Sequence, residues 1–341
     1  MKYRPVFGLL AILFAILQLA GCQQPNSHKK PSKDFDTLRV TYRLKWLFNA
    51  STAGDLWAKE KGLFKANRLL VQIKEGGAEQ DAIEEIELGR AQFGVASADQ
   101  VLRAVSRGAD VLVLAQIFQI NPLQWIYMKS RVDLEGLNKG QLKDALEKLT
   151  VGITYGGNDE AIFMALVKSL GLDPDRLHIY AITYDYAPFW RGQVDLWPCY
   201  KNTQGITLSE KMEAMGNKPG FLDPSCYGIN FVANSLITSK RFAQEYPEVV
   251  ETFTKCIIDG WKQAISPKNR SEMAGILSRY EKTLSKDTIV RQLEATADLI
   301  TFHGQRPVGL IDKNAWDQTY RVMFQQGLLK RKVEVGRLFV K

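Results

Sequence analysis

Apolar and polar residues follow two different periods along this chain, and their order predicts an α/β fold. Alternation over Thr37–Arg43 predicts a first β-strand, and the apolar run Leu69–Ile73 predicts a second. Residues 80–88 have the three- to four-residue spacing of a helix, and a further short strand is expected at residues 93–95. This repeated strand–helix order predicts a parallel sheet with helices on both faces.

The segment Leu88–Gln100 is the feature on which the prediction of a ligand site depends. Gly89 is suited to the positive φ of a helix C-terminus, and Ser97 with Gln100 has the pattern of a capping box at the start of the next helix. In open α/β sheets, ligands bind where a strand gives way to a helix, because unpaired N–H groups point there. Ser97 and Asp99 are therefore candidate ligand contacts. The alternative is that Ser97 only caps its own helix.

The second part of the chain repeats this organisation. A strand is predicted at residues 151–153, and glycines precede the helix that follows it. Gly89–Ser97 and Gly192–Tyr200 both run from a glycine through alternating residues to a strand end. If each half carries the same unit, Ser97 and Tyr200 lie at matching strand ends on opposite sides of a cleft. Chance similarity of two short segments is the alternative.

This order of elements predicts two lobes between which the chain crosses twice. The first lobe is expected to comprise residues 37–125 and 230–341, and the second lobe residues 126–229. Leu123–Tyr127 and Gly228–Phe231 are the expected hinges. The predicted fold class is α/β, with each lobe a mostly parallel sheet flanked by helices.

The N-terminus has the pattern of an exported lipoprotein. Two basic residues precede an apolar run from Val6 to Leu17, which is short for a membrane span but suited to a signal peptide. Leu19-Ala20-Gly21-Cys22 resembles the lipobox of bacterial lipoproteins, whose cysteine is acylated. Residues 1–21 are expected to be a signal peptide and residues 22–36 a lipidated flexible tether. The expected location is the cell envelope, on the extracytoplasmic side of a membrane.

Composition fits a soluble globular body. The chain has 341 residues, of which 45% are apolar and 24% charged, enough for two domains. Its net charge of +8 is mild for this length and spread along the chain, so no nucleic-acid partner is expected.

The sequence lacks the residue patterns that would indicate a metal site or an enzyme active site. It has three His, and Cys199, Cys226 and Cys256 match no zinc pattern, so no metal or cofactor is expected. Outside the cytoplasm a disulfide is permitted, and Cys199 with Cys226 is the pair to test. The sequence contains no nucleophile elbow, HExxH motif or phosphate loop. We therefore do not expect an enzyme.

Six short motifs carry a resemblance to a known family. They are Trp46…Asn49-Ala50…Ala53-Gly54, Ala58-Lys59-Glu60-Lys61-Gly62, Phe93-Gly94-Val95-Ala96-Ser97-Ala98-Asp99-Gln100, Gln116…Gln119…Pro122-Leu123, Gly156-Gly157-Asn158-Asp159-Glu160 and Val194-Asp195-Leu196-Trp197-Pro198…Tyr200…Asn202. In this order and spacing they resemble the NMT1/THI5-like substrate-binding proteins of thiamine-pyrimidine, riboflavin, sulfonate and nitrate importers. The resemblance covers Leu38 to the C-terminus. It implies a type II periplasmic-binding-protein fold and a receptor that delivers its ligand to an ABC permease; we expect a monomer.

Motif residues and aromatic side chains at strand ends or in loops make up the predicted ligand site. A flat heteroaromatic ligand needs rings to stack on and donors and acceptors at its edge. The predicted ligand-binding residues are Trp46, Asn49, Ser97, Asp99, Gln119, Tyr155, Gly157, Asn158, Glu160, Tyr186, Trp197, Tyr200 and Asn202. Asn158 has the alternative role of a helix cap. For Phe189 and Trp190, core packing is the favoured interpretation.

Three positions depart from the pyrimidine-binding branch of this family. Lys45, Phe48 and Thr203-Gln204-Gly205 stand where Asp, Pro and Asn-Glu-Pro are common in that branch. A carboxylate suits the amino donors of an aminopyrimidine, so Lys45 and Gln204 argue against that ligand. Lys45 favours an anionic ligand if it faces the cleft; a solvent-facing Lys45 is the alternative.

The expected function is capture of a small heteroaromatic or anionic nutrient, of thiamine-pyrimidine, flavin or sulfonate type, for an ABC permease. A sensory protein that signals to a membrane partner would have the same sequence features. A pyrimidine-synthesising enzyme of the THI5 type is a third hypothesis. The resemblance to those enzymes implies a reacting histidine and a cysteine-rich context. Here His28 lies in the predicted tether and the cysteines do not cluster.

Overall fold

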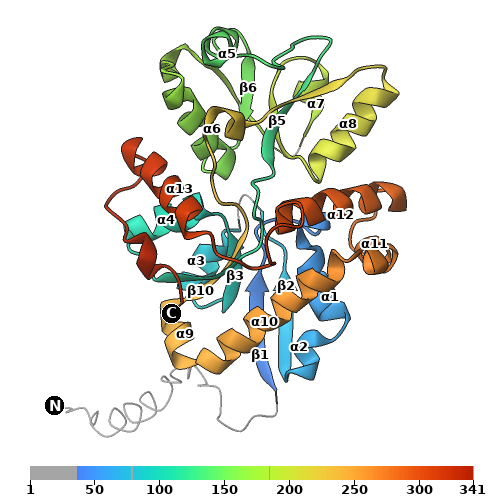
Figure 1. Ribbon diagram of the computed structural model, residues 1–341, viewed down its shortest axis with the longest axis vertical. Helices are drawn as coiled ribbons and strands as arrows, with labels where there is room; N and C mark the ends of the chain where they lie inside the picture. The colour runs from blue at the N-terminus through green and yellow to red at the C-terminus, as the bar shows by residue number, and fades with distance from the viewer. Residues whose placement is uncertain (1–36, 78–79, 184, 341) are drawn as a thin grey trace, which may run out of the picture. The chain divides into compact units, whose positions relative to one another are not determined.

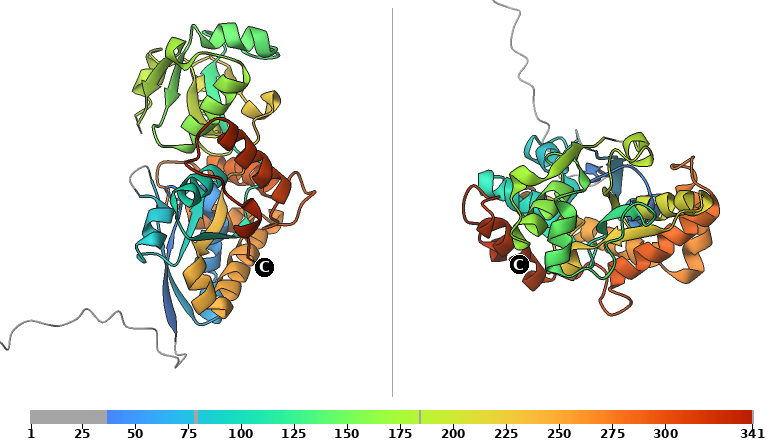
Figure 2. Two further views of the ribbon diagram at one scale, coloured as in Figure 1. Left: turned by 90° about the vertical axis from the view of Figure 1, so that its left-hand side faces the viewer. Right: turned by 90° about the horizontal axis from the view of Figure 1, so that it is seen from above.

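The fold consists of two groups of strands, each covered by helices, and the chain passes between the groups twice (Figure 1, Figure 2). The computed structural model describes residues 37–77, 80–183 and 185–340. The predicted signal peptide and tether, with Cys22, lie outside these residues. In the part of the chain that is described, no helix combines the length and apolarity needed to cross a membrane.

The first group is a five-stranded mixed sheet with the order β2-β1-β3-β10-β4. β1 and β3 are parallel, and Tyr42 pairs with Phe93. β10 runs antiparallel between β3 and β4, where Ser235 pairs with Ala96 and Gln116. The strands are β1 (Leu38–Arg43), β2 (Leu69–Lys74), β3 (Phe93–Ala96), β4 (Val111–Gln116) and β10 (Ser235–Ser239).

Helices from both ends of the described chain surround this sheet. They are α1 (Ala53–Glu60), α2 (Leu63–Ala66), α3 (Ala82–Glu87), α4 (Ala98–Arg107), α9 (Lys240–Glu245), α10 (Pro247–Ala264), α11 (Arg270–Leu277), α12 (Lys286–Thr301) and α13 (Lys313–Gln325). Phe253 of α10 stacks on Phe93 of β3 with ring centroids 3.7 Å apart. Aromatic rings thus fix the long C-terminal helix against the sheet centre.

The second group contains a three-stranded sheet and a two-stranded sheet. The three-stranded sheet has the order β8-β5-β9, and β5 is antiparallel to both neighbours. The two-stranded sheet pairs β6 and β7 in parallel. The elements are β5 (Leu123–Met128), α5 (Lys139–Leu146), β6 (Thr150–Ile153), α6 (Asn158–Ser169), β7 (His178–Ala181), α7 (Ala187–Trp190), β8 (Trp197–Tyr200), α8 (Gln204–Ala214) and β9 (Pro219–Leu222).

The predicted α/β class with helix-flanked sheets is confirmed, but parallel pairing is less general than expected. β5 carries the chain into the second group, whereas β8 and β9 both run back toward the first. Strands that run in opposite directions through one sheet pair antiparallel. β10 begins at Ser235, and residues 229–234 form the segment that leads back to the first group.

A buried carboxyl group lies in the core of the first group. Asp55, in the first turn of α1, is 3% exposed, and the Tyr42 hydroxyl donates a hydrogen bond to it at 2.8 Å. Burial raises the pKa of Asp55 to about 7, because the charged form loses its hydration, and the hydrogen bond from Tyr42 opposes this rise. The fold therefore favours the protonated form of Asp55.

We expect this carboxyl group to make stability depend on pH. Its contribution to the free energy of unfolding is full below the unfolded-state pKa of about 3.9 and is lost as the pH rises through the folded-state pKa of about 7. Asp55→Asn keeps an acceptor for Tyr42 and removes this titration. Urea unfolding should therefore show the variant gaining stability relative to the wild type from about pH 4 to about pH 8.

The exposed Asp175 provides the matched control, because Asp175→Asn removes the same charge from the surface. A stability difference between Asp55→Asn and the wild type that stays constant over this pH range would contradict the assignment.

Candidate functional site

Polar side chains from both groups of strands meet where β1, β3 and β8 end. Lys45 Nζ, after β1, donates to the Tyr200 hydroxyl at the end of β8, with 2.8 Å between the two atoms. The Tyr200 hydroxyl donates in turn to Asn234 Oδ1 at 3.3 Å, just before β10. We call the polar residues at this junction the strand-end cluster. Its members are Lys45, Ser97, Asp99, Arg103, Gly157, Asp159, Tyr200 and Asn234, together with Trp46, Asn158 and Asn202, which lie within two residues of these members along the chain.

Ser97 and Asp99 form the β3–α4 side of the strand-end cluster. The capping box is present, and the Ser97 N–H donates to Gln100 Oε1 at 3.1 Å. The Ser97 hydroxyl donates to Asp99 Oδ1 at 2.5 Å, and both side chains are buried. Ser97 is thus the N-cap of α4, and a ligand contact by Ser97 or Asp99 stays a prediction.

Arg103 connects α4 to the second group of strands. Its guanidinium pairs with Asp99 Oδ2 at 2.9 Å and donates to the Gly157 carbonyl at 3.2 Å. The Asp99 carboxylate therefore positions the Arg103 guanidinium beside the start of α6. The motifs did not indicate Arg103, although its position four residues after Asp99 on a helix places the two side chains on one face.

The turn before α6 is shaped by glycine. Gly156 has a φ of +76°, and a Cβ on Gly157 would lie 2.4 Å from Asp159 Oδ1. Asp159 Oδ2 accepts the Thr154 N–H at 2.6 Å. Burial raises the pKa of Asp159 to about 6, and the positive charge of Lys45 acts in the opposite direction. Asp159 and Lys45 therefore interact electrostatically across the junction.

Three other predicted residues near this turn have different surroundings. Asn158 is the first residue of α6 and not its cap, which is Gly157. The Asn158 amide nitrogen is buried and has no hydrogen-bond partner in the described residues. Glu160 accepts the Gly156 N–H at 2.9 Å, and Tyr155 is 65% exposed. Glu160 thus supports the turn, whereas Asn158 has an unused donor.

Asn202 ties the segment after β8 to the first group. It is 1% exposed, and its amide nitrogen donates to Ser51 Oγ at 3.0 Å and Thr296 Oγ1 at 2.8 Å. Its Oδ1 is buried without a partner in the described residues. Asn49 is the N-cap of the short helix that contains Ser51, whose N–H it accepts at 2.7 Å. Trp46 is half-buried.

Helix α12 makes further contacts with α8 beside Asn202. The Thr288 hydroxyl donates to Glu210 at 2.9 Å, and Gln292 Nε2 donates to the Thr203 carbonyl at 3.2 Å. Arg291 also pairs with Glu210 at 2.7 Å. One long helix of the first group therefore reaches the second group directly.

Trp197 and Tyr186 lie in a hydrophobic cluster of the second group. Trp197 is 2% exposed, its ring is 5.3 Å from that of Tyr186, and it also contacts Phe189. Burial raises the pKa of Tyr186 to about 12. Phe189 is confirmed as core. A ligand contact by Trp197 or Tyr186 stays a prediction, and we leave both out of the proposed site.

The suggested disulfide is absent from the structure. Cys199 is a buried free thiol packed in the same hydrophobic cluster as Trp197, and burial raises its pKa to about 12. Cys226 is an exposed free thiol in the turn before Gly228. The proposed pair is therefore corrected to two separate thiols.

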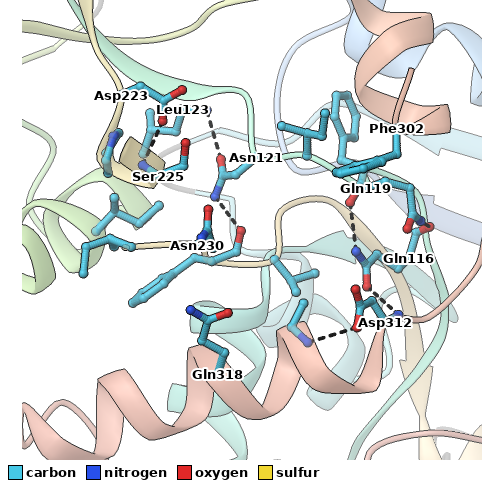
Figure 3. Close-up of a pocket in the computed structure, with 18 of the residues that line it drawn as sticks. Gln116, Gln119, Asn121, Leu123, Asp223, Ser225, Asn230, Phe302, Asp312 and Gln318 are labelled. Carbon is cyan, nitrogen blue, oxygen red and sulfur yellow. Dashed lines mark hydrogen bonds between the residues drawn. The ribbon is translucent and has the colours of Figure 1, made fainter. Parts of the chain in front are cut away.

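Gln119 lines a pocket of about 520 Å³ beside the two connecting segments (Figure 3). Its amide nitrogen donates to the carbonyls of Gln116 at 3.0 Å and Leu310 at 2.9 Å. In the same pocket, Asn121 Oδ1 accepts the Leu123 N–H and Asn121 Nδ2 donates to the Phe231 carbonyl, both at 2.9 Å. Asn121 thus joins the two connecting segments.

In the part of the chain that the structure describes, no three His, Cys, Asp or Glu side chains are grouped as a metal site would require.

Solved structures with this fold are periplasmic binding proteins and relatives of them. The alkanesulfonate-binding protein SsuA from Xanthomonas axonopodis pv. citri, bound to MOPS, has a TM-score of 0.65 at 17% identity, covering 89% of this chain and 98% of that chain. The nitrate-binding protein NrtA from Synechocystis PCC 6803 has a TM-score of 0.62 at 12% identity, covering 89% and 86%. The desulfurization enzyme DSZB also matches, with a TM-score of 0.58 at 13% identity, covering 89% and 96%. The fold is therefore that of the periplasmic binding proteins, which also includes an enzyme.

Sequence comparison gives the family. A family model described as NMT1/THI5 like matches residues 49–270, and the chain belongs to this family. A Haemophilus influenzae protein named as a candidate thiamine biosynthesis protein is 22% identical over 298 residues, covering 86% of this chain and 88% of that protein. The family predicted from the motifs is confirmed.

Tyr200 belongs to the strand-end cluster and Trp197 to a packed hydrophobic cluster. We therefore expect substitutions of these two residues to lower the free energy of unfolding by different amounts. Trp197→Ala removes a large ring from a packed hydrophobic cluster and should lower the free energy of unfolding by about 3–5 kcal/mol. Tyr200→Phe keeps the ring and removes only the hydroxyl, so a loss of about 1 kcal/mol is expected. Urea unfolding measures both values. An equal decrease in the free energy of unfolding in the two variants would place Tyr200 in the hydrophobic core and contradict its assignment to the strand-end cluster.

Proposed function

We propose that this protein is an extracytoplasmic solute-binding protein that captures a small heteroaromatic or anionic nutrient and delivers it to an ABC permease. The lobes are residues 37–125 with 230–341, and residues 126–229. The main support is the strand-end cluster, where Lys45 and Arg103 of one lobe hydrogen-bond to Tyr200 and Gly157 of the other. Polar groups from both lobes thus surround one place at which a ligand would bridge them.

Closure of the lobes is the proposed mechanism. The lobes are linked by two segments that Asn121 holds together, an arrangement suited to rotation about a hinge. A ligand that contacts Lys45 and Tyr200 at once has more contacts in the closed form than in the open form. Its binding therefore shifts the population toward the closed form, which the permease would recognise.

Trp46 is the aromatic side chain that we assign to ligand stacking, because it is half-buried and next to Lys45. The test begins with mass spectrometry of the molecule that copurifies with the full-length protein, followed by a binding panel of pyrimidines, flavins and sulfonates. Trp46→Ala should weaken the best ligand by about ten-fold or more. The melting temperature of the ligand-free protein should change little.

Tyr180→Ala serves as the control for Trp46→Ala, because Tyr180 is an exposed ring on β7. Loss of stability without loss of affinity in Trp46→Ala would contradict the proposed site. Recovery of the bound molecule in altered form after incubation would instead favour the enzyme hypothesis, since a binding protein returns its ligand unchanged. Capture of a signalling partner without transport would favour the sensory hypothesis.

Lipid anchoring is proposed from the sequence around Cys22, which resembles a lipobox. Cys22→Ser removes the thiol that would be acylated, so the variant protein should move from the membrane fraction to the soluble fraction of the envelope. Immunoblotting of the two fractions measures this shift. Cys226→Ser removes an exposed thiol and should leave the distribution unchanged. Membrane association of Cys22→Ser equal to wild type would refute the anchor.

A further inference from the structure

We infer that Lys45 selects the ligand by charge, so that the captured nutrient carries an anionic group that binds the Lys45 ammonium. This inference rests on the proposed function and specifies its ligand class. It starts from the bonding of Lys45 itself. An ammonium has three donors, and the structure gives Lys45 Nζ one hydrogen bond, to the neutral hydroxyl of Tyr200.

Lys45 lacks a counter-charge in contact. Among the described residues, it takes part in no ion pair, whereas the other cation of the strand-end cluster, Arg103, is paired with Asp99. Lys45 is half-buried, and its ammonium lies 5.4 Å from the centroid of the Tyr200 ring. Moving a cation from water to a site lined by neutral groups costs free energy unless an anion binds beside it.

Asp159 does not take the place of that anion. Its Oδ2 accepts the Thr154 N–H, and burial, which raises the pKa of Asp159 to about 6, disfavours its charged form. The charges of Asp159 and Lys45 interact electrostatically, but the two side chains form no ion pair in the described residues. The Tyr200 hydroxyl cannot compensate the charge either, because it is neutral and its own proton is directed to Asn234.

A second unused donor belongs to the same junction. The Asn158 amide nitrogen, next to Asp159, is buried and donates to no group in the described residues. Buried donors without acceptors are rare, and they are expected where a ligand supplies the acceptor. Lys45 and Asn158 are thus donors with unused capacity, one from each lobe, and a sulfonate, carboxylate or phosphate group that reached both would offer an oxygen acceptor to each.

The test uses charged and uncharged versions of the same ring as probes. Detergent-solubilised full-length protein is titrated calorimetrically with benzenesulfonate and benzenesulfonamide, with benzoate and benzamide, and with phenyl phosphate. We expect at least one anion to bind about ten-fold or more tightly than its neutral counterpart. Lys45→Met should abolish this preference, and Lys45→Arg should restore most of it.

Lys65→Met is the matched control, because it removes the same charge from an exposed position. It should leave the preference unchanged, and melting temperatures verify that all variants fold. The inference is overturned if no anion binds, if the neutral probes bind as well as the anions, or if the preference survives in Lys45→Met.

Failure of the inference and failure of the proposed function give different results. Binding of a neutral probe alone, with a smaller radius of gyration in X-ray scattering, would overturn the role of Lys45 and leave the solute-binding function intact. Absence of binding by every probe, with no molecule released when envelope-purified protein is denatured, would overturn both.

Discussion

The two hydrogen bonds of the Asn121 side chain are the constraint on which the rest of the arrangement depends. The bond from Asn121 Nδ2 to the Phe231 carbonyl joins the segment that enters the second group of strands to the segment that leaves it, and the bond from the Leu123 N–H to Asn121 Oδ1 fixes Asn121 within the entering segment. Two chain passages held side by side resist translation of the parts they join but permit rotation. In the proposed closure, the ends of β1, β3 and β8 would therefore separate and meet again in the same register.

Hydrogen bonds within the protein already engage several polar groups of the strand-end cluster. Ser97 donates to Asp99, and Asp99 pairs with Arg103. These bonds form when the protein folds, so the side chains are already positioned and their ordering adds no free-energy cost to ligand binding. The groups left with unused capacity are the ones able to contribute binding energy.

Local signals in the sequence are sufficient for much of the fold. The capping box at Ser97 and the positive φ of Gly89 are confirmed, because each depends on neighbouring residues alone. The insertion of β10 between β3 and β4 and the antiparallel pairing of β5 join distant segments, which periodicity does not reveal. For the site, the strand-end rule selected Tyr200, and a departure from the pyrimidine-binding branch drew attention to Lys45. A family motif selected Trp197, whose ring packs among apolar neighbours that no local pattern shows.

The contacts of α12 with α8 are a further set of non-covalent bonds between the two groups of strands, in addition to those of Lys45 with Tyr200 and of Arg103 with Gly157. Thr288, Gln292 and Arg291 hold Glu210 and the backbone of Thr203 through groups that can part and rejoin. Any separation of the two groups of strands would therefore have to break bonds at α12 as well as at the strand-end cluster.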